Sequence, residues 1–388
     1  MSELQALDKQ YVAGTYARFP VEIVRGKGSL VYDTEGKEYI DLGTGIGVTA
    51  FGIGDEGWKA AVIGQLDLVQ HTSNLYYTEP CARLAELLCA KTGLKKVFFG
   101  NSGAEANECA IKVARKYAAE KKGAEYNVIV TLKNSFHGRT LTTLAATGQE
   151  HYHELYQPLT PGFVHTEAGN MEELVKIVAE YKVAGILIEC IQGEGGVNVV
   201  DGDYIRAVAT LCEKEDILFM VDEVQTGNGR TGKLYAYMNF GVVPDVVTTA
   251  KGLGGGLPIG ACLLGEKVEG VLGFGDHGST YGGNPIACAG ACNVISRVDD
   301  ELLAEVVAKG DYLKKAFEGA KGVKSVSGLG LMVGIETERP AAEVVKAAIG
   351  KGVLALTAKN KVRLLPALNI PMEQLKKAVE ILLSIMAE

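Results

Sequence analysis

Five segments of the sequence place polar, charged or glycine residues just after a short apolar run. The runs end at Phe99, Leu132, Ile191, Val221 and Thr249, and the segments that follow are Gly100–Glu105, Ser135–Arg139, Gln192–Gly196, Asp222–Gly227 and Ala250–Gly256. In a doubly wound sheet, ligands bind beyond the carboxyl ends of the strands. We therefore expect these five segments to gather at one edge of a sheet and to form a single site.

Lys251 is the candidate nucleophile of that site. It stands alone between the apolar run that ends at Ala250 and the glycine-rich segment that starts at Gly252. Burial lowers the pKa of an amine, and a neutral amine can attack an aldehyde. A solvated loop lysine is the alternative for most lysines, and the flanking residues make it the weaker interpretation here.

The tripeptide Ser102-Gly103-Ala104 opens a predicted helix. Free backbone N–H groups and the positive end of the helix dipole at such a start suit a phosphate. A plain helix cap is the alternative, and the tripeptide taken alone favours it.

Three further side chains at the same predicted edge have two interpretations each. Asp222 is either a helix cap or a carboxylate that keeps a pyridine nitrogen protonated, so that the ring acts as an electron sink. Phe136 is either core or a ring that stacks on a cofactor. Arg139 is either a surface charge or the planar group that grips a substrate carboxylate.

The elements that must position these residues alternate between short β-rich runs and amphipathic stretches from Leu94 to Ala250, which predicts a parallel sheet covered by helices. The expected strands are Lys96–Phe99, Val128–Leu132, Gly185–Ile191, Leu218–Val221 and Val246–Thr249, and the clearest helices are Ala104–Glu120 and Met171–Tyr181. After Pro285 the pattern predicts a smaller α+β lobe.

The chain is thus expected to be an α/β protein with a mainly parallel, doubly wound sheet and a smaller α+β domain. We predict an N-terminal segment (1–45) that joins the small domain, a large domain (46–284) and a small C-terminal domain (285–388). The length of 388 residues is sufficient for two such domains.

Composition narrows the classes of partner. A net charge of −8 argues against binding to nucleic acid or to an anionic membrane, since either needs a basic face. We find neither a secretory signal nor an apolar run of membrane-spanning length. The eight cysteines stand singly in apolar contexts, which predicts buried thiols in a reducing cytoplasm, and we expect no metal site.

Taken together, eight stretches of the sequence closely resemble the class III aminotransferases and, within them, the acetylornithine branch. In chain order they are TYARFPVEIVRGKG from Thr15, QHTSNLYYTEP from Gln70, NSGAEANE from Asn101, SFHGRT from Ser135, IQGEGG from Ile191, DEVQTGNGRTG from Asp222, TTAKGLGGGLPIGA from Thr248 and HGSTYGGNPIACAGA from His277. The resemblance runs over nearly the whole chain and implies fold type I of the enzymes that use pyridoxal 5'-phosphate (PLP).

The resemblance also implies the residues that hold PLP. These would be Ser102, Gly103, Ala104, Phe136, Asp222, Val224, Gln225 and Lys251, joined by Thr280 from the second subunit of a homodimer with shared active sites. Lys251 would bind the cofactor covalently and then move a proton, and Asp222 would pair with the pyridine nitrogen. Gln225 would reach the phenolic oxygen, while Phe136 and Val224 would cover the two faces of the ring.

For the substrates, the resemblance implies two carboxylate sites. Arg139 would bind the α-carboxylate when a δ-amine reacts, with Ser279 and Tyr16 nearby. Arg363 would take the α-carboxylate of glutamate, and Glu194 would mask it during the other half-reaction.

The implied reaction converts N2-acetylornithine and 2-oxoglutarate into N-acetylglutamate 5-semialdehyde and glutamate, a step of arginine biosynthesis. Succinylornithine, N-succinyl-diaminopimelate, ornithine or another ω-amino acid are alternative substrates. The same motifs are also compatible with a class III mutase or decarboxylase, or with a PLP-fold protein without catalysis.

The sequence departs from the family pattern in two places. Phe51–Trp58 stands where members commonly carry L-G-H-x-H-P, near the expected substrate entrance, and this bears on acyl-group specificity. Cys190 replaces the proline of E-P-I-Q-G-E, from which we expect a mild loss of local rigidity.

Overall fold

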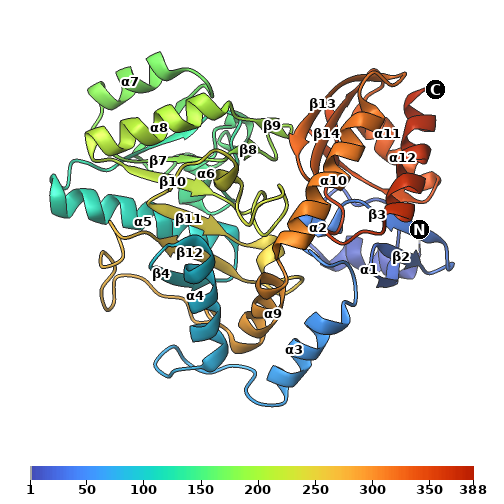
Figure 1. Ribbon diagram of the computed structural model, residues 1–388, viewed down its shortest axis with the longest axis horizontal. Helices are drawn as coiled ribbons and strands as arrows, with labels where there is room; N and C mark the ends of the chain where they lie inside the picture. Colours follow the sequence, from blue (N-terminus) through green and yellow to red (C-terminus); the bar gives the residue numbers. More distant parts are fainter. Residues whose placement is uncertain (1) are drawn as a thin grey trace.

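The computed structural model describes residues 2–388, which form two lobes of unequal size (Figure 1). The larger lobe surrounds a seven-stranded sheet, and the smaller lobe holds two four-stranded sheets and carries both labelled chain ends. Among these residues, no helix is long and apolar enough to cross a membrane.

The large sheet confirms the expected α/β architecture. Its strands lie in the order β4 (Lys96–Gly100), β12 (Gly260–Leu264), β11 (Val246–Thr249), β10 (Leu218–Asp222), β7 (Val183–Ile188), β5 (Val128–Leu132) and β6 (Phe163–Thr166). Strands β11, β10, β7, β5 and β6 pair in parallel, whereas β12 is antiparallel to both of its neighbours.

The strand predicted over Gly185–Ile191 is wrong at its end. Strand β7 stops at Ile188, and a separate short strand, β8 (Ile191–Gln192), pairs with β9 (Asn198–Val199). At the break, the carboxylate of Glu189 accepts hydrogen bonds from the backbone N–H groups of Phe136 (3.0 Å) and Gly193 (3.3 Å). This contact ties the strand end to two loops and takes the chain out of the sheet.

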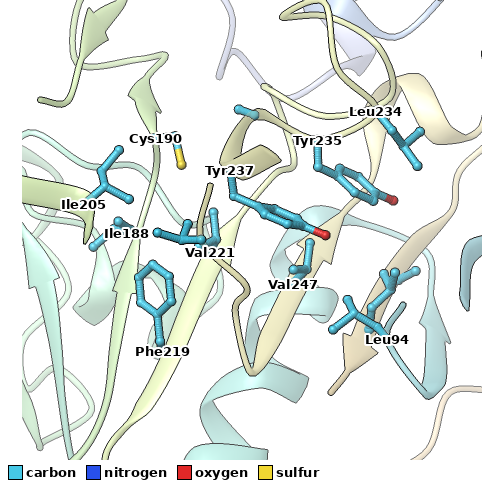
Figure 2. Close-up of a cluster of buried hydrophobic side chains, with 14 of the residues drawn as sticks. Leu94, Ile188, Cys190, Ile205, Phe219, Val221, Leu234, Tyr235, Tyr237 and Val247 are labelled. Atoms are coloured by element: carbon cyan, nitrogen blue, oxygen red, sulfur yellow. The ribbon is translucent and has the colours of Figure 1, made fainter. Parts of the chain in front are cut away.

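Alternation along β10 sends its side chains to opposite faces of the large sheet. Leu218 and Met220 pack with helix α5 (Gly103–Lys121) on one face. Phe219 and Val221 belong to the larger core on the other face, part of which is seen in Figure 2. The next residue, Asp222, therefore lies on the α5 face, at the edge where α5 begins.

Four helices supply buried side chains to that larger core: α4 (Glu79–Thr92), α7 (Met171–Glu180), α8 (Gly202–Glu215) and α9 (Pro285–Ser296). The smaller elements are α1 (Glu3–Tyr11), α2 (Thr44–Gly47), α3 (Glu56–Leu66), α6 (Leu141–Ala146) and the 3-10 turns η1 (Glu150–Tyr152), η2 (Ala236–Asn239) and η3 (Lys251–Leu253).

The smaller lobe combines the two ends of the chain. One sheet has the order β1 (Ile23–Lys27), β2 (Leu30–Asp33), β3 (Glu38–Asp41) and β15 (Val353–Leu354), and the other has β13 (Val323–Leu329), β14 (Met332–Thr337), β17 (Lys361–Leu364) and β16 (Leu356–Ala358). Helices α10 (Asp300–Phe317), α11 (Ala341–Gly350) and α12 (Met372–Met386) pack on them. The parallel pairing of β3 with β15 supports the proposed union of residues 1–45 with the C-terminal domain. The exact domain limits stay a proposal.

Candidate active site

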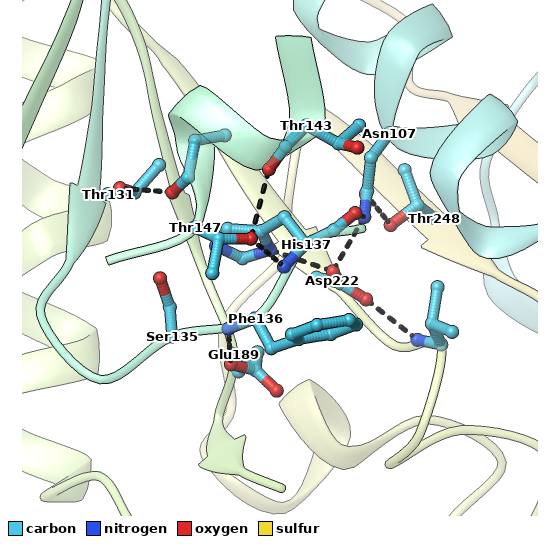
Figure 3. Close-up of polar contacts among 12 residues, drawn as sticks. Asn107, Thr131, Ser135, Phe136, His137, Thr143, Thr147, Glu189, Asp222 and Thr248 are labelled. Carbon is cyan, nitrogen blue, oxygen red and sulfur yellow. Dashed lines mark hydrogen bonds and ion pairs between the residues drawn. The ribbon is translucent and has the colours of Figure 1, made fainter. Parts of the chain in front are cut away.

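Asp222, at the end of β10, is the centre of a buried hydrogen-bond cluster, shown in Figure 3. Its carboxylate accepts from His137 Nδ1 and Asn107 Nδ2, both at 2.8 Å, and from the backbone N–H of Val224 at 2.9 Å. Asn107 lies on α5, and its Oδ1 accepts from the Thr248 hydroxyl at 2.7 Å. That bond fixes the amide with its NH₂ toward Asp222. We call these five residues the Asp222 cluster.

Asn107 and His137 are two members of this cluster that our reasoning from the sequence missed. Both lie inside recognised motifs, and both are almost fully buried, at 1% and 2% exposure. A buried polar side chain needs a partner, so the polar Asn107 among the apolar residues of α5 was the available signal. The Nε2 atom of His137 is buried without a hydrogen-bond partner in residues 2–388.

A cavity of about 450 Å³ opens next to Asp222. Its lining includes Ser102, Gly103, Ala104, Phe136, Arg139, Asp222, Val224, Gln225 and Lys251. The lining therefore includes residues of four of the five predicted segments, whereas no residue of Gln192–Gly196 lines the cavity and the chain before that segment contributes Glu189. A cavity of this size is typical of small-molecule sites.

The start of α5 approaches the end of β10 closely. Ser102 caps the helix by accepting a hydrogen bond from Glu105 N. A Cβ atom at Gly103 would lie 2.6 Å from Val224 Cγ1, so a side chain there would collide. The glycine thus lets the start of the helix pack against Val224 at the wall of the cavity, where the helix dipole favours an anion.

Lys251 occupies strained backbone at the end of β11. Its φ of +48° lies in the left-handed region, which non-glycine residues keep only when the surroundings enforce it. Residues 44–47 of α2 also all have positive φ, and a Cβ atom at Gly252 would lie 3.3 Å from Gly47 O. Burial lowers the pKa of the Lys251 amine, although the Glu194 carboxylate acts in the opposite direction.

Arg363 reaches the site from β17 of the smaller lobe. Its Nη1 donates to Glu194 Oε1 at 2.5 Å and to Gln225 Oε1 at 3.0 Å, and Gln225 Nε2 donates to Glu194 Oε1 at 3.2 Å. Burial alone would raise the pKa of Glu194, but the Arg363 guanidinium outweighs it and leaves that pKa lowered. The pair adjoins the cavity through Gln225, which lines it.

Arg139 also lines the cavity and lies among aromatic rings. Its Cζ atom is 4.1 Å from the centroid of Tyr152 and 5.6 Å from that of Phe136. In the part of the chain that the structure describes, Arg139 forms no ion pair. A guanidinium without an ion-pair partner can bind a substrate carboxylate without first releasing a protein carboxylate.

Glu189 is a further buried carboxylate in the cavity wall, and sequence reasoning did not find it. Burial raises its pKa to about 7. Its two backbone partners are Phe136 itself and Gly193, the residue before Glu194. Cys190, which follows Glu189 in place of the family's proline, is fully buried.

Besides Glu194 and Arg363, three predicted residues lie outside the lining of the cavity. Ser279 and Thr280 line a second cavity of about 660 Å³, and Ser279 Oγ accepts from Asn101 Nδ2 at 3.1 Å. Tyr16 is 75% exposed. One chain by itself does not bring these residues to Lys251.

Comparisons with known proteins agree with this geometry. The profile of the family described as Aminotransferase class-III matches residues 11–386. The acetylornithine aminotransferase of Haemophilus ducreyi is 50% identical over 388 residues, which cover 100% of this chain and 99% of that protein. The N-acetylornithine aminotransferase structure from Stenotrophomonas maltophilia has a TM-score of 0.85 at 35% identity, covering 98% of each chain. An ornithine aminotransferase structure from Toxoplasma gondii, with partial occupancy of PLP, has a TM-score of 0.93 at 32% identity, covering 99% of this chain and 94% of that one.

Proposed function

The chain belongs to the class-III aminotransferase family, and we propose that it transfers the δ-amino group of N2-acetylornithine to 2-oxoglutarate in arginine biosynthesis. The products are N-acetylglutamate 5-semialdehyde and glutamate. The observation that carries this proposal is the unequal state of two arginines beside Lys251: Arg363 is paired with Glu194, whereas Arg139 is free of ion pairs within residues 2–388.

We infer that the cavity holds PLP, as the family implies, because its residues fit the groups of that molecule. The N–H groups of Gly103 and Ala104 suit the phosphate, and the Asp222 carboxylate has three of about four lone-pair sites filled, which leaves one for a ring nitrogen. Phe136 and Val224 supply apolar surfaces to the ring. When bound, PLP supplies an electron sink for charge that develops on the substrate carbon.

The proposed roles of Lys251 follow from its surroundings. Desolvation favours the neutral amine, which can bond to the cofactor and can also accept a proton from the substrate carbon. The hydrogen bonds of the Asp222 cluster hold the Asp222 carboxylate in place, where it can pair with a protonated ring nitrogen. Glu189 holds the Phe136 loop in place by its hydrogen bond to the backbone.

Two unlike substrates must use this one cavity. Acetylornithine presents its δ-amine to Lys251 and places its distant α-carboxylate at Arg139. Glutamate presents its α-amine, and its α-carboxylate must then displace Glu194 from Arg363. While Arg363 is paired, its attraction for the α-carboxylate of ornithine-like substrates is cancelled, which keeps the α-amine away from the reaction.

We also propose a homodimer with shared active sites. Apolar side chains lie exposed beside Thr280, among them Leu75, Tyr76 and Tyr77 at 87%, 70% and 105%, and such exposure marks a surface for a partner. A second chain on this surface could bring its Thr280 to the phosphate at Gly103.

Mixing inactive Lys251→Ala subunits with inactive Thr280→Ala subunits then restores activity, since one site of each heterodimer has both residues. Heterodimers without activity would contradict shared sites.

The substrate is tested with a panel of ω-amino acids that includes acetylornithine, succinylornithine, N-succinyl-diaminopimelate and ornithine. Formation of glutamate from 2-oxoglutarate is measured for each compound. We expect the largest kcat/KM for acetylornithine. A larger kcat/KM for another compound would identify that compound as the preferred substrate. If no compound yields glutamate, the proposed transamination is wrong.

A further inference from the structure

Trp58 is the single tryptophan of the sequence and ends the segment Phe51–Trp58, where the chain departs from the family pattern. Its indole Nε1–H donates a hydrogen bond to the carbonyl oxygen of Gly254 at 3.0 Å. Gly254 in turn donates its backbone N–H to the carbonyl oxygen of Lys251, also at 3.0 Å. Two successive hydrogen bonds therefore join the indole to the backbone of Lys251.

The indole also has a closely defined position. A Cβ atom at Gly255 or at Gly290 would lie 2.8 Å from Trp58 Nε1, so glycines are required on both sides of the ring. Gly290 belongs to α9, and Gly255 precedes Gly256, which lines the cavity. The ring thus fills the space between α9 and the loop that follows Lys251.

The helix that carries Trp58 is fixed by an ion pair. Asp55 caps α3 by accepting from Trp58 N at 2.9 Å, and its two carboxylate oxygens accept from Arg297 Nη1 at 2.6 Å and Nη2 at 3.0 Å. The Arg297 guanidinium also lies 3.8 Å from the centroid of Phe51. Arg297 directly follows α9. Helix α9 therefore holds the start of α3 through this ion pair and contacts the indole through Gly290.

We propose that Trp58 is a positioning residue for Lys251. Its indole N–H holds Gly254, and Gly254 closes the turn that keeps Lys251 at its left-handed φ of +48°. Without this donor, the turn can relax and move the amine away from the place where it bonds to the cofactor and exchanges a proton. The inference rests on the proposed function in that it takes Lys251 to bear PLP.

The test removes the indole N–H while keeping an aromatic ring. Trp58→Phe is purified with PLP, and the rate of PLP release into cofactor-free buffer is followed by visible absorbance. We expect release to become about fivefold faster and kcat to fall about fivefold with KM nearly unchanged, a size that one hydrogen bond supports. Because Trp58 is the single tryptophan, replacement of its indole by benzothiophene changes shape least and must give the same result.

Asp55→Asn is the matched control. Asparagine still accepts from Trp58 N and so keeps the start of α3, but it weakens the pair with Arg297. We expect a lower Tm, while PLP release and kcat change much less than in Trp58→Phe, because the indole N–H still donates to Gly254. If Trp58→Phe and the benzothiophene variant behave like Asp55→Asn, Trp58 supports only the fold and the inference is wrong. PLP release needs no substrate, so this comparison decides even if acetylornithine proves to be the wrong substrate.

Discussion

The Asp222 cluster and the Glu194–Arg363 pair both adjoin Lys251, and they are built in opposite ways. The Asp222 cluster lies wholly in the larger lobe, and Asp222 is 3% exposed. The Glu194–Arg363 pair joins a loop of the larger lobe to β17 of the smaller one, and the Glu194 side chain is 26% exposed. The first region is therefore buried within one lobe, and the second crosses between the lobes and is partly exposed at Glu194; we call them the closed and the open region.

The difference between the two regions suits them to two tasks, which are holding a cofactor and exchanging one carboxylate for another. A buried network with its donors and acceptors matched has one favoured arrangement, which suits the holding of a cofactor. An ion pair with a partly exposed partner can exchange that partner for the carboxylate of a ligand. Buried Arg230 also donates to the carbonyl oxygens of Leu331 and Pro366, so this contact joins the lobes independently of Glu194.

The largest effect is expected at Lys251, which both regions adjoin. Lys251→Ala should lower turnover by more than about 10⁴-fold, because it removes the bond to the cofactor and the proton transfer, and the latter alone contributes about 10²–10⁴-fold. Steady-state assays with acetylornithine measure this. A variant that keeps close to the parental rate would show that Lys251 is not the central residue.

A second substitution removes one of the hydrogen-bond donors to Asp222. Asn107→Ala removes a charge-assisted hydrogen bond to Asp222, and we expect kcat to fall about tenfold, together with a shifted absorbance of bound PLP. Thr248→Val is the control, since it removes only the outer bond to Asn107. Equal losses in the two variants would mean that the cluster is general packing and does not act through Asp222.

Glu194→Gln tests whether the open region exchanges partners. The variant keeps the size of the side chain and removes its charge, so Arg363 becomes available to a carboxylate. In single-turnover absorbance measurements, the glutamate half-reaction should become about three- to tenfold faster or tighter, while reaction at the δ-amine loses selectivity. Equal losses in both half-reactions would show that Glu194 is a fixed support.

The smallest effect concerns acid stability. The pKa of Glu194 in the folded chain is lowered from its ordinary value of 4.5, since the Arg363 guanidinium outweighs burial. On acidification the unfolded chain therefore takes up a proton first, and the stability from this linkage is present above pH 4.5 and lost below it. Denaturant unfolding gives the free energy of unfolding of wild type and of Glu194→Gln. The difference between the two free energies should be constant from pH 5.5 to 8 and should shrink below about pH 4.5. A constant difference at all pH values would contradict the pairing.

The centre of the closed region was predictable because local pattern places the strand ends, whereas Asn107 and His137, the partners of Asp222, were not. Asp222 and Lys251 each follow an apolar strand, and strand ends of a parallel sheet meet at one edge. Asn107 was missed because an amide in a helix carries no local sign of its partner, Asp222, which is 115 residues away. Strand β12 was missed because Gly260–Leu264 is a short apolar run without alternation.

The open region could not be predicted from local pattern. Glu194 and Arg363 are 169 residues apart and meet only because β17 belongs to a different lobe. Resemblance to a family suggested the pair, whereas spacing and periodicity gave no indication of it. The contact of Trp58 with Gly254 spans 196 residues and lies where the family pattern is absent, so neither approach could have found it.

The pleat of β10 has a consequence for how this chain can diverge. Asp222 and Glu223 are consecutive acids on opposite faces: the first adjoins the cavity, and the second accepts from the backbone N–H groups of Ala236 and Tyr237 in the core. An in-frame loss of one codon from β10 would exchange their faces, with Asp222 sent into the apolar core. The apolar residues of β10 can therefore be substituted, whereas the number of residues in the strand is fixed. Active gene copies should carry their insertions and deletions outside β10.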